Sequence, residues 1–329
     1  MSESPLRQAL WPLGMLYGAV AAARNFAFDA GLKRVHALAV PVVSVGNLTV
    51  GGTGKTPTVA WLCQLATARG RRPGVLARGY GRAAGDRLND EGEMLARRFP
   101  ELLQEQDPDR VAAGRRLVER GADYIVLDDG FQHRRLGRDL DIVCLDAALP
   151  FGNGHCLPAG DLREFRSGLR RAGLLLLTRA ERLAPDALAA RVQRLRRIAG
   201  KPELPIRAAT HAPAAVTAWP SGDVTPPGAL AGVRVALLSA IARPASFRAT
   251  VETLGAEVVR ELRYRDHHRY TDAEARAAVA VAESEGALLL TTEKDDAKLA
   301  RLAPELPRSA LRVDLQFLDT EPAATELLL

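Results

Sequence analysis

The stretch that most constrains the fold is residues 42–58, which read V-V-S-V-G-N-L-T-V-G-G-T-G-K-T-P-T. The β-branched residues at its start predict a buried strand, and residues 58–68 have the composition of a helix. Strand, glycine-rich loop, Gly-Lys-Thr and helix together are typical of a P-loop, which binds the phosphates of a nucleotide. A glycine-rich turn with a chance Gly-Lys-Thr is the alternative, and the flanking strand and helix disfavour it.

The chemistry of the loop follows from its residue types. Gly51, Gly52 and Gly54 have no Cβ, so the backbone N–H groups can approach phosphate oxygens. Lys55 is predicted to reach the β- and γ-phosphates, and the Thr56 hydroxyl is predicted to ligate Mg²⁺. The usual pattern has glycine five residues before Gly54, where this chain has Thr49. The predicted nucleotide-binding residues are Thr49, Val50, Gly51, Gly52, Thr53, Gly54, Lys55 and Thr56.

A second phosphate-side element is predicted at residues 124–129. The apolar run 124–127 reads as a short strand and ends in Asp128 and Asp129. A carboxylate at the end of a strand beside a P-loop can hold Mg²⁺ or its water shell. The sequence leaves open which of the two aspartates is the direct ligand.

The order of predicted elements sets the fold class. Strands and helices alternate from residue 42 to residue 198, which predicts an α/β fold of the P-loop NTPase type, with a doubly wound, mostly parallel sheet. A helix is expected to start at residues 162–164. Prolines become frequent after Lys201, and a second, smaller α/β domain is expected beyond them. The predicted divisions are an N-terminal helix over residues 1–30, a P-loop domain over 31–210 and a C-terminal domain over 211–329.

Composition restricts the partners. The formal net charge is +6, which favours anionic partners such as phosphates or an acidic membrane surface. Aromatic residues make up only 5% of the chain, too few for a surface that stacks bases, so no nucleic-acid partner is expected. The three cysteines form no C-x-x-C pair, so neither a disulfide framework nor a zinc knuckle is predicted.

The N-terminal segment allows two interpretations. Residues 11–23 are uncharged and include Trp and Tyr, and Arg24, Lys33 and Arg34 follow. This pattern suits a helix that lies in a membrane interface, although it is too short to span a bilayer. An ordinary helix packed on the protein core fits the same residues.

Two polar stretches could carry catalysis. Residues 89–93, N-D-E-G-E, open a helical pattern, where acidic residues are also expected simply as caps. Residues 266–270 read D-H-H-R-Y. If the two histidines lie on one strand, their side chains face opposite ways, so a shared metal site is disfavoured. One histidine is expected to have a catalytic or substrate role.

Seven motifs together resemble one enzyme family. In chain order they are G-N-L-T-V-G-G-T-G-K-T, R-G-Y-G-R, N-D-E-G, L-D-D-G-F-Q-H, L-P-A-G-D-L-R-E, D-H-H-R-Y-T and T-T-E-K-D. The chain resembles the tetraacyldisaccharide 4'-kinases of lipid A biosynthesis, from the N-terminal apolar segment to about Asp296. The variant P-loop with Thr49 has the form found in that family.

The resemblance implies transfer of the γ-phosphate of ATP, with Mg²⁺, to the 4'-hydroxyl of tetraacyldisaccharide 1-phosphate, which forms lipid IVA. It implies a catalytic role for Lys55 and for a catalytic pair, Asp90 with His267. The family's D-E-P motif reads Asp90-Glu91-Gly92 in this chain. Further residues are implied near the lipid phosphate or the metal, namely His133, Arg163 and Glu164. It also implies that the N-terminal helix contacts the cytoplasmic face of the inner membrane, as a peripheral or shallowly inserted element. No protein partner is implied.

Two other functions remain as alternatives at this stage. P-loop GTPases and metallochaperones share a similar glycine-rich loop, but guanine recognition normally uses N-K-x-D, and the nearest match here is residues 293–296, E-K-D-D. A membrane adaptor that uses a nucleotide only as a switch is the second alternative.

Overall fold

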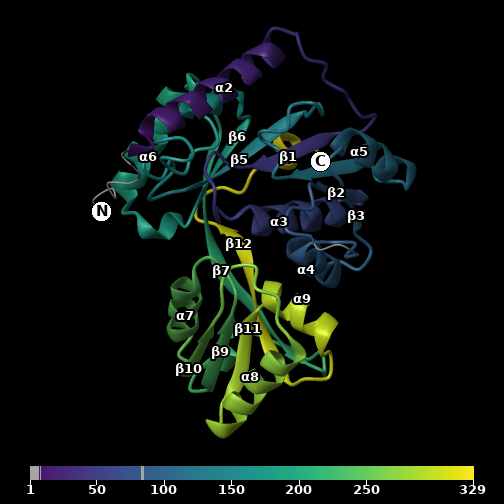
Figure 1. Ribbon diagram of the computed structural model, residues 1–329, viewed down its shortest axis with the longest axis vertical. Helices are drawn as coiled ribbons and strands as arrows, with labels where there is room; N and C mark the ends of the chain where they lie inside the picture. The colour runs from purple at the N-terminus through teal and green to yellow at the C-terminus, as the bar shows by residue number, and fades with distance from the viewer. Residues whose placement is uncertain (1–6, 8, 83–84) are drawn as a thin grey trace. The chain divides into compact units, whose positions relative to one another are not determined.

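The computed structural model describes residue 7 and residues 9–82 and 85–329, which form two compact units (Figure 1). The first unit contains the chain up to Arg78, Leu102–His211 and Leu315–Leu329. The second contains Gly79–Glu101 and Ala212–Asp314. Both units are therefore discontinuous in sequence, whereas the domains predicted over 31–210 and 211–329 are continuous; those domain boundaries stay a prediction.

The first unit contains a parallel sheet with strand order β7-β6-β5-β1-β4-β2-β3. Strand β1 lies between β4 and β5, so the loop after β1 begins inside the sheet and not at its edge. The strands are β1 (Val42–Gly46), β2 (Pro73–Ala77), β3 (Leu103–Gln106), β4 (Tyr124–Asp128), β5 (Leu140–Asp146), β6 (Leu174–Thr178) and β7 (Ile206–Trp219). The chain leaves this unit within β7 and returns within β12 (Arg308–Phe317).

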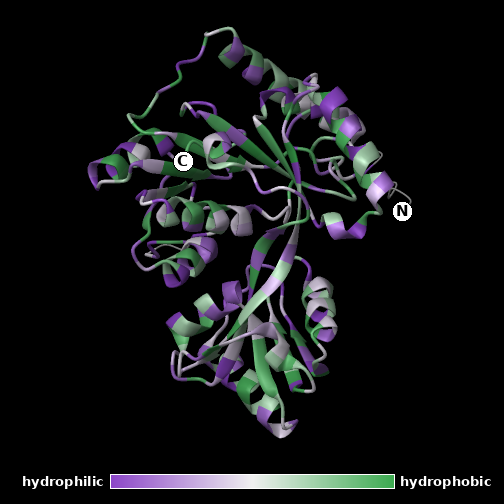
Figure 2. Ribbon diagram, turned by 180° about the vertical axis from the view of Figure 1, so that it is seen from behind, coloured by the Kyte–Doolittle hydropathy of each residue, from purple (hydrophilic) through white to green (hydrophobic). Residues whose placement is uncertain are grey.

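Burial explains the composition of these strands. Every residue of β1, β2 and β6 is buried, as expected for parallel strands covered on both faces. In Figure 2 much of this sheet is coloured green, the hydrophobic end of the scale. The helices of this unit are α2 (Trp11–Asp29), α3 (Lys55–Ala68), α5 (Arg110–Glu119) and α6 (Pro185–Ala199), and its 3₁₀ helices are η1 (Arg166–Arg171), η2 (Ala180–Arg182) and η4 (Ala324–Leu327). The parallel α/β prediction is confirmed.

The second unit is a smaller α/β structure. Its strands β9 (Arg234–Ser239), β10 (Glu257–Arg263), β11 (Leu288–Thr292) and β12 pair in parallel, and β8 (Val224–Thr225) pairs antiparallel with β7. Its helices are α4 (Asp90–Arg98), α7 (Pro244–Thr253), α8 (Asp272–Ser284) and α9 (Glu293–Leu302), with the 3₁₀ helix η3 (Pro227–Leu230). Helix α4 packs against α9, although about 200 residues separate them in sequence.

One local prediction is wrong. No helix starts at residues 162–164. The Arg163 N–H donates instead to the Leu48 carbonyl, and Leu162 forms isolated bridges with Thr49 and Cys156, so tertiary contacts hold this stretch, and a 3₁₀ helix begins only at Arg166. The condition that the two histidines share a strand is not met. They lie in the loop after β10, where His267 has the left-handed φ of 61°.

Candidate active site

The loop between β1 and α3 has the geometry of a phosphate cradle. Gly51 and Gly54 have φ of 100° and 85°, a region that non-glycine residues rarely adopt. A Cβ built on Gly51 or on Gly52 would have no other atom within 4 Å, so this side of the loop is open. Helix α3 begins at Lys55, directly after the turn, and points its first N–H groups toward the loop.

The other side of the loop is fixed by hydrogen bonds. The Thr178 hydroxyl donates to the Thr53 carbonyl at 3.0 Å, and the Arg179 guanidinium donates to the Gly52 carbonyl at 2.8 Å. In a planar trans peptide the C=O and N–H point in opposite directions. The N–H groups of Thr53 and Gly54 therefore point away from the Arg179 and Thr178 side chains. The Asn47 side chain adds a bond to the Thr53 hydroxyl at 3.0 Å.

Asn47, Thr178 and Arg179 are site residues that sequence reasoning missed. Thr178 ends β6, about 125 residues after the loop, and Arg179 is itself held by an ion pair with Asp146 at 2.8 Å. The available signal was the polar pair Thr-Arg at the end of an apolar strand, because such strand ends meet at one edge of a parallel sheet.

Lys55 lies beside one of the two predicted metal ligands. Its Nζ is 3.5 Å from Asp129 Oδ1, and Arg163 Nη1 is 2.7 Å from both Asp129 oxygens. Burial opposes the charge on Asp129, but Lys55 and Arg163 outweigh it and hold the pKa of this carboxyl below its usual range. Asp128 is the last residue of β4 and pairs in register with Val45 of β1. The structure thus brings together Lys55, Asp129 and Arg163.

His133 is tied to an arginine that the sequence did not single out. Its Nδ1 is 3.1 Å from Arg110 Nη1. Burial, Arg110 and Arg138 lower the pKa of His133 to about 4, so the imidazole is neutral at physiological pH and can accept a hydrogen bond from Arg110. Arg110 is buried, and the charges of Asp128 and Asp129 act on it.

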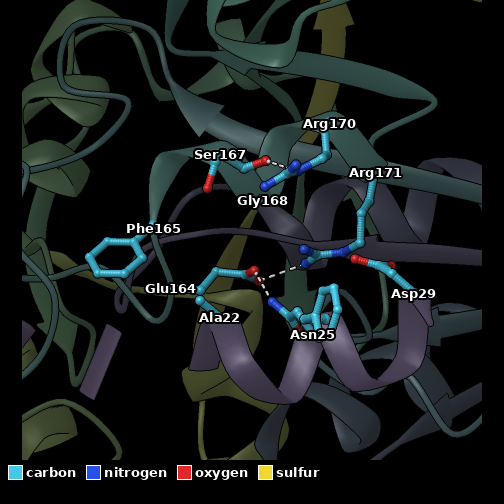
Figure 3. Close-up of a pocket in the computed structure, with 10 residues that line it drawn as sticks. Ala22, Asn25, Asp29, Glu164, Phe165, Ser167, Gly168, Arg170 and Arg171 are labelled. Carbon is cyan, nitrogen blue, oxygen red and sulfur yellow. Dashed lines mark hydrogen bonds and ion pairs between the residues drawn. The ribbon is translucent and has the colours of Figure 1, made fainter. Parts of the chain in front are cut away.

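Glu164 joins helix α2 to the core of the first unit. It is 2% exposed, and its carboxylate accepts bonds from Asn25 at 2.7 Å and from Arg171 at 2.8 Å (Figure 3). Gln132 donates to the same carboxylate at 3.0 Å. These bonds occupy both carboxylate oxygens. Gln132 also donates to the Asn47 carbonyl at 2.9 Å, so this network reaches the start of the phosphate loop.

A pocket opens between α2 and the η1 segment (Figure 3). Its walls combine apolar groups with the two guanidinium groups of Arg170 and Arg171. The lining residues are Ala22, Asn25, Phe26, Asp29, Glu164, Phe165, Ser167, Gly168, Arg170 and Arg171. Such a mixture suits a ligand with an anionic group next to an apolar part.

Helix α2 buries only two glycines and one asparagine. Gly14, Gly18 and Asn25 face the protein, and a Cβ on Gly18 would lie 2.5 Å from the Phe165 ring. Large apolar side chains of this helix are instead exposed by 42–66%, namely Trp11, Leu13, Met15, Leu16, Tyr17, Val20 and Phe26. Among the described residues, no helix has the length and apolar character needed to cross a membrane.

The second unit holds the other predicted pair. Asp90 is the first residue of α4, after the N-cap Asn89, and its Oδ2 is 3.2 Å from His267 Nδ1. Burial raises the pKa of Asp90, but His267, Lys298 and Lys294 outweigh it, so the pKa is lowered overall. The bond to Asp90 raises the pKa of His267.

His268, next to His267 in the sequence, contacts an aromatic ring and a glutamate instead of Asp90. His268 stacks on Tyr264 with ring centroids 4.5 Å apart, and its Nε2 is 3.2 Å from Glu274. The adjacent histidines thus have separate partners.

Gly92, where the family motif has proline, is used by the helix cap. Its N–H donates to Asn89 Oδ1 at 3.0 Å, and Asn89 Nδ2 donates to the Tyr80 carbonyl at 3.1 Å. Proline has no N–H and could not make the first bond. The departure from D-E-P therefore gives α4 an additional N-terminal hydrogen bond.

Comparisons with known proteins agree over nearly the whole chain. The family model for tetraacyldisaccharide-1-P 4'-kinase matches residues 6–329. A tetraacyldisaccharide 4'-kinase of Anaeromyxobacter sp. (strain Fw109-5) is 43% identical, covering 93% of this chain and 86% of that protein. One of Syntrophus aciditrophicus is 38% identical, covering 95% and 90%. The crystal structure of an "apo" form LpxK from Aquifex aeolicus in complex with ATP matches with a TM-score of 0.76 at 28% identity and covers 98% of each chain.

Proposed function

Because the chain belongs to the tetraacyldisaccharide-1-P 4'-kinase family, we propose that it transfers the γ-phosphate of ATP to the 4'-hydroxyl of tetraacyldisaccharide 1-phosphate. The product is lipid IVA, an intermediate of lipid A biosynthesis. The observation that carries this function is the family match over residues 6–329 together with an open phosphate cradle that ends in Lys55. A GTPase and a nucleotide-switched adaptor are set aside, since the similar proteins named above are kinases.

The first unit fits ATP with Mg²⁺. The space beside Gly51 and Gly52 is open, and Thr178 and Arg179 orient the N–H groups of the loop. The Lys55 ammonium lies 3.5 Å from Asp129, one of the proposed metal ligands. We assign Thr49 through Thr56 to the nucleotide. The oxygen donors of Thr56, Asp128 and Asp129 suit Mg²⁺, which keeps several waters and phosphate oxygens in its shell and would neutralise charge on the transferred group.

Asp90 is proposed as the general base. As the 4'-oxygen bonds to the γ-phosphorus and the bond from phosphorus to the β,γ-bridging oxygen breaks, the hydroxyl proton moves to the Asp90 carboxylate and ADP leaves. The lowered pKa keeps Asp90 ionised at physiological pH, so it is ready to accept that proton. The role of His267 is to orient the carboxylate through the 3.2 Å bond. Lys55 stabilises the charge on the γ-phosphate.

Replacing Asp90 tests this assignment. Asp90→Asn keeps the size of the side chain but removes the basic oxygen, and we expect kcat to fall by about 100-fold or more while ATP affinity is kept. Asp272→Asn is a matched control, because Asp272 is an exposed carboxylate at the start of another helix of the same unit. If Asp90→Asn and Asp272→Asn have the same kcat as the wild type, Asp90 is not the base.

We further propose that α2 holds the enzyme on the cytoplasmic face of the inner membrane. The support is its row of exposed apolar side chains, with Arg24, Lys33 and Arg34 at its C-terminal side to meet anionic headgroups. The pocket beside α2 offers Arg170 and Arg171 to an anionic group of the acceptor, with apolar walls toward its acyl part.

Charge placed on this face should release the protein from lipid. Leu16→Glu with Val20→Glu is expected to lower binding to phosphatidylglycerol-containing vesicles by about tenfold or more, because two carboxylates would enter the apolar layer. Leu302→Glu is the control, an exposed leucine in the second unit. Equal sedimentation of all three proteins with vesicles would contradict the proposed contact.

A further inference from the structure

Lys298 is the most enclosed cation next to Asp90. It lies on α9, its side chain is only 9% exposed, and its Nζ is 3.5 Å from Asp90 Oδ2 and 3.0 Å from Asp295 Oδ1. The Tyr270 ring lies 5.7 Å from the same ammonium. An ammonium in such a place keeps its charge only if carboxylates compensate for the lost water. Asp90 and Asp295 supply that compensation.

Asp295 is itself fixed on its far side. It is fully buried, and its Oδ2 accepts bonds from the Ala240 N–H at 3.0 Å and from the Thr292 hydroxyl at 2.9 Å. The carboxylate therefore cannot rotate to follow the lysine. Because Asp295 and Lys298 are three residues apart on one helix, the fixed carboxylate can hold the ammonium on their shared face of α9.

We propose that Lys298 is a positioning residue for the kinase reaction, in which its buried ammonium fixes the orientation and the ionised state of the Asp90 carboxylate. The inference rests on the proposed role of Asp90 as general base. It adds a residue that does not itself contact the reacting atoms but determines how the base is presented.

The other charged groups around Asp90, including His267, which also orients the carboxylate, act from more exposed positions. His267 is 43% exposed and lies on a loop, and Lys294 is bonded to Glu91 of α4 at 2.9 Å. The His267 bond lowers the pKa of Asp90 most, and Lys298 adds a charge from a position where water is largely excluded, which strengthens its action. On geometry, Lys298 is the most enclosed partner of Asp90.

Lys298→Met removes the charge but keeps the length of the side chain. We expect kcat to fall by about 100-fold, the cost of a base misplaced by an ångström, with the KM for ATP changed less than about twofold. The low-pH limb of kcat/KM should move to higher pH. The pKa of Asp90, read by ¹³C NMR of its carboxyl group, should rise. Lys298→Arg, which keeps the charge, should recover at least part of kcat.

A double variant distinguishes the positioning role of Lys298 from a purely structural one. Lys298→Met alone leaves Asp295 buried without its cation and should lower the melting temperature. Adding Asp295→Asn removes that charge while the amide oxygen can still accept from Ala240. We expect the double variant to regain thermal stability but not kcat. Recovery of both, or wild-type kcat in Lys298→Met, would overturn the inference.

Different results would refute the proposed function and the proposed role of Lys298. A wild-type protein that binds ATP but phosphorylates no acceptor would refute the proposed function. An active wild type with an unchanged Asp90 pKa in Lys298→Met would refute the inference alone, since that titration is read without any turnover.

Discussion

Substitutions in the phosphate loop can separate backbone strain from loss of the ligand. Gly54 has φ of 85°, and a Cβ there would lie 2.5 Å from His211 Nε2 and 3.0 Å from Thr178 Cγ2. Gly52 lies two residues earlier, has no left-handed φ and would place its Cβ in open space. Alanine at the two positions therefore makes a matched pair within one loop.

The magnitudes follow from these contacts. For Gly54→Ala, the left-handed backbone costs about 1–2 kcal/mol and the clash with His211 a further 1–3 kcal/mol or so. The sum is a loss of about 2–5 kcal/mol of unfolding free energy. For Gly52→Ala neither contribution applies, and the change should stay within about 0.5 kcal/mol. The new methyl group occupies the open side of the cradle, so ATP affinity should nevertheless fall, by about tenfold or more.

Urea unfolding followed by circular dichroism gives the stabilities, and calorimetric titration gives the ATP affinities. We expect Gly54→Ala to lose both stability and ATP binding, and Gly52→Ala to lose ATP binding alone. Adding His211→Ala to Gly54→Ala should recover the part due to the clash, about 1–3 kcal/mol. Equal stability of the two single variants would refute the reasoning, as would full ATP affinity in Gly52→Ala.

Three further predictions concern other parts of the first unit. Asp129→Asn should destabilise the protein at neutral pH, because the folded state holds the pKa of Asp129 below its ordinary 3.8. The difference in melting temperature from the wild type should persist above pH 3.8 and vanish as the pH falls through the pKa of Asp129 in the folded protein. Gly18→Val should displace α2, because even a Cβ would lie 2.5 Å from the Phe165 ring, and proteolysis within the first 30 residues should become faster. Cys144 should not react with a thiol reagent in the native state, since its thiol is buried and burial raises its pKa to about 11; rapid labelling without denaturant would contradict its placement.

The parts of the candidate site whose local structure agrees with the sequence-based prediction are those whose chemistry needs neighbouring residues. A phosphate loop requires strand, glycines, lysine and helix in direct succession, so residues 42–68 contain the whole pattern. The strand that ends at Asp128 is predicted for the same reason. The support behind the loop was missed, because Thr178 and Arg179 reach it only through the pairing of β6 with its neighbours in the sheet.

Tertiary contacts also explain the wrong helix prediction. Residues 162–164 are held by contacts with Leu48, Thr49 and Cys156, and the helical turn begins only at Arg166. The two histidines lie in a loop, where His267 has a left-handed backbone, so alternation along a strand does not describe where their side chains point. Lys298 looks like an ordinary helix residue in the sequence. Only the packing of α4 against α9 puts it beside Asp90.

The most direct test of the central claim is transfer of labelled γ-phosphate from ATP to purified tetraacyldisaccharide 1-phosphate in detergent with Mg²⁺. We expect a labelled bisphosphorylated lipid with the wild type. We expect none with Lys55→Met, and none with an acceptor that lacks the 4'-hydroxyl. Label released as inorganic phosphate regardless of the acceptor, or no transfer by protein shown to bind ATP, would contradict it.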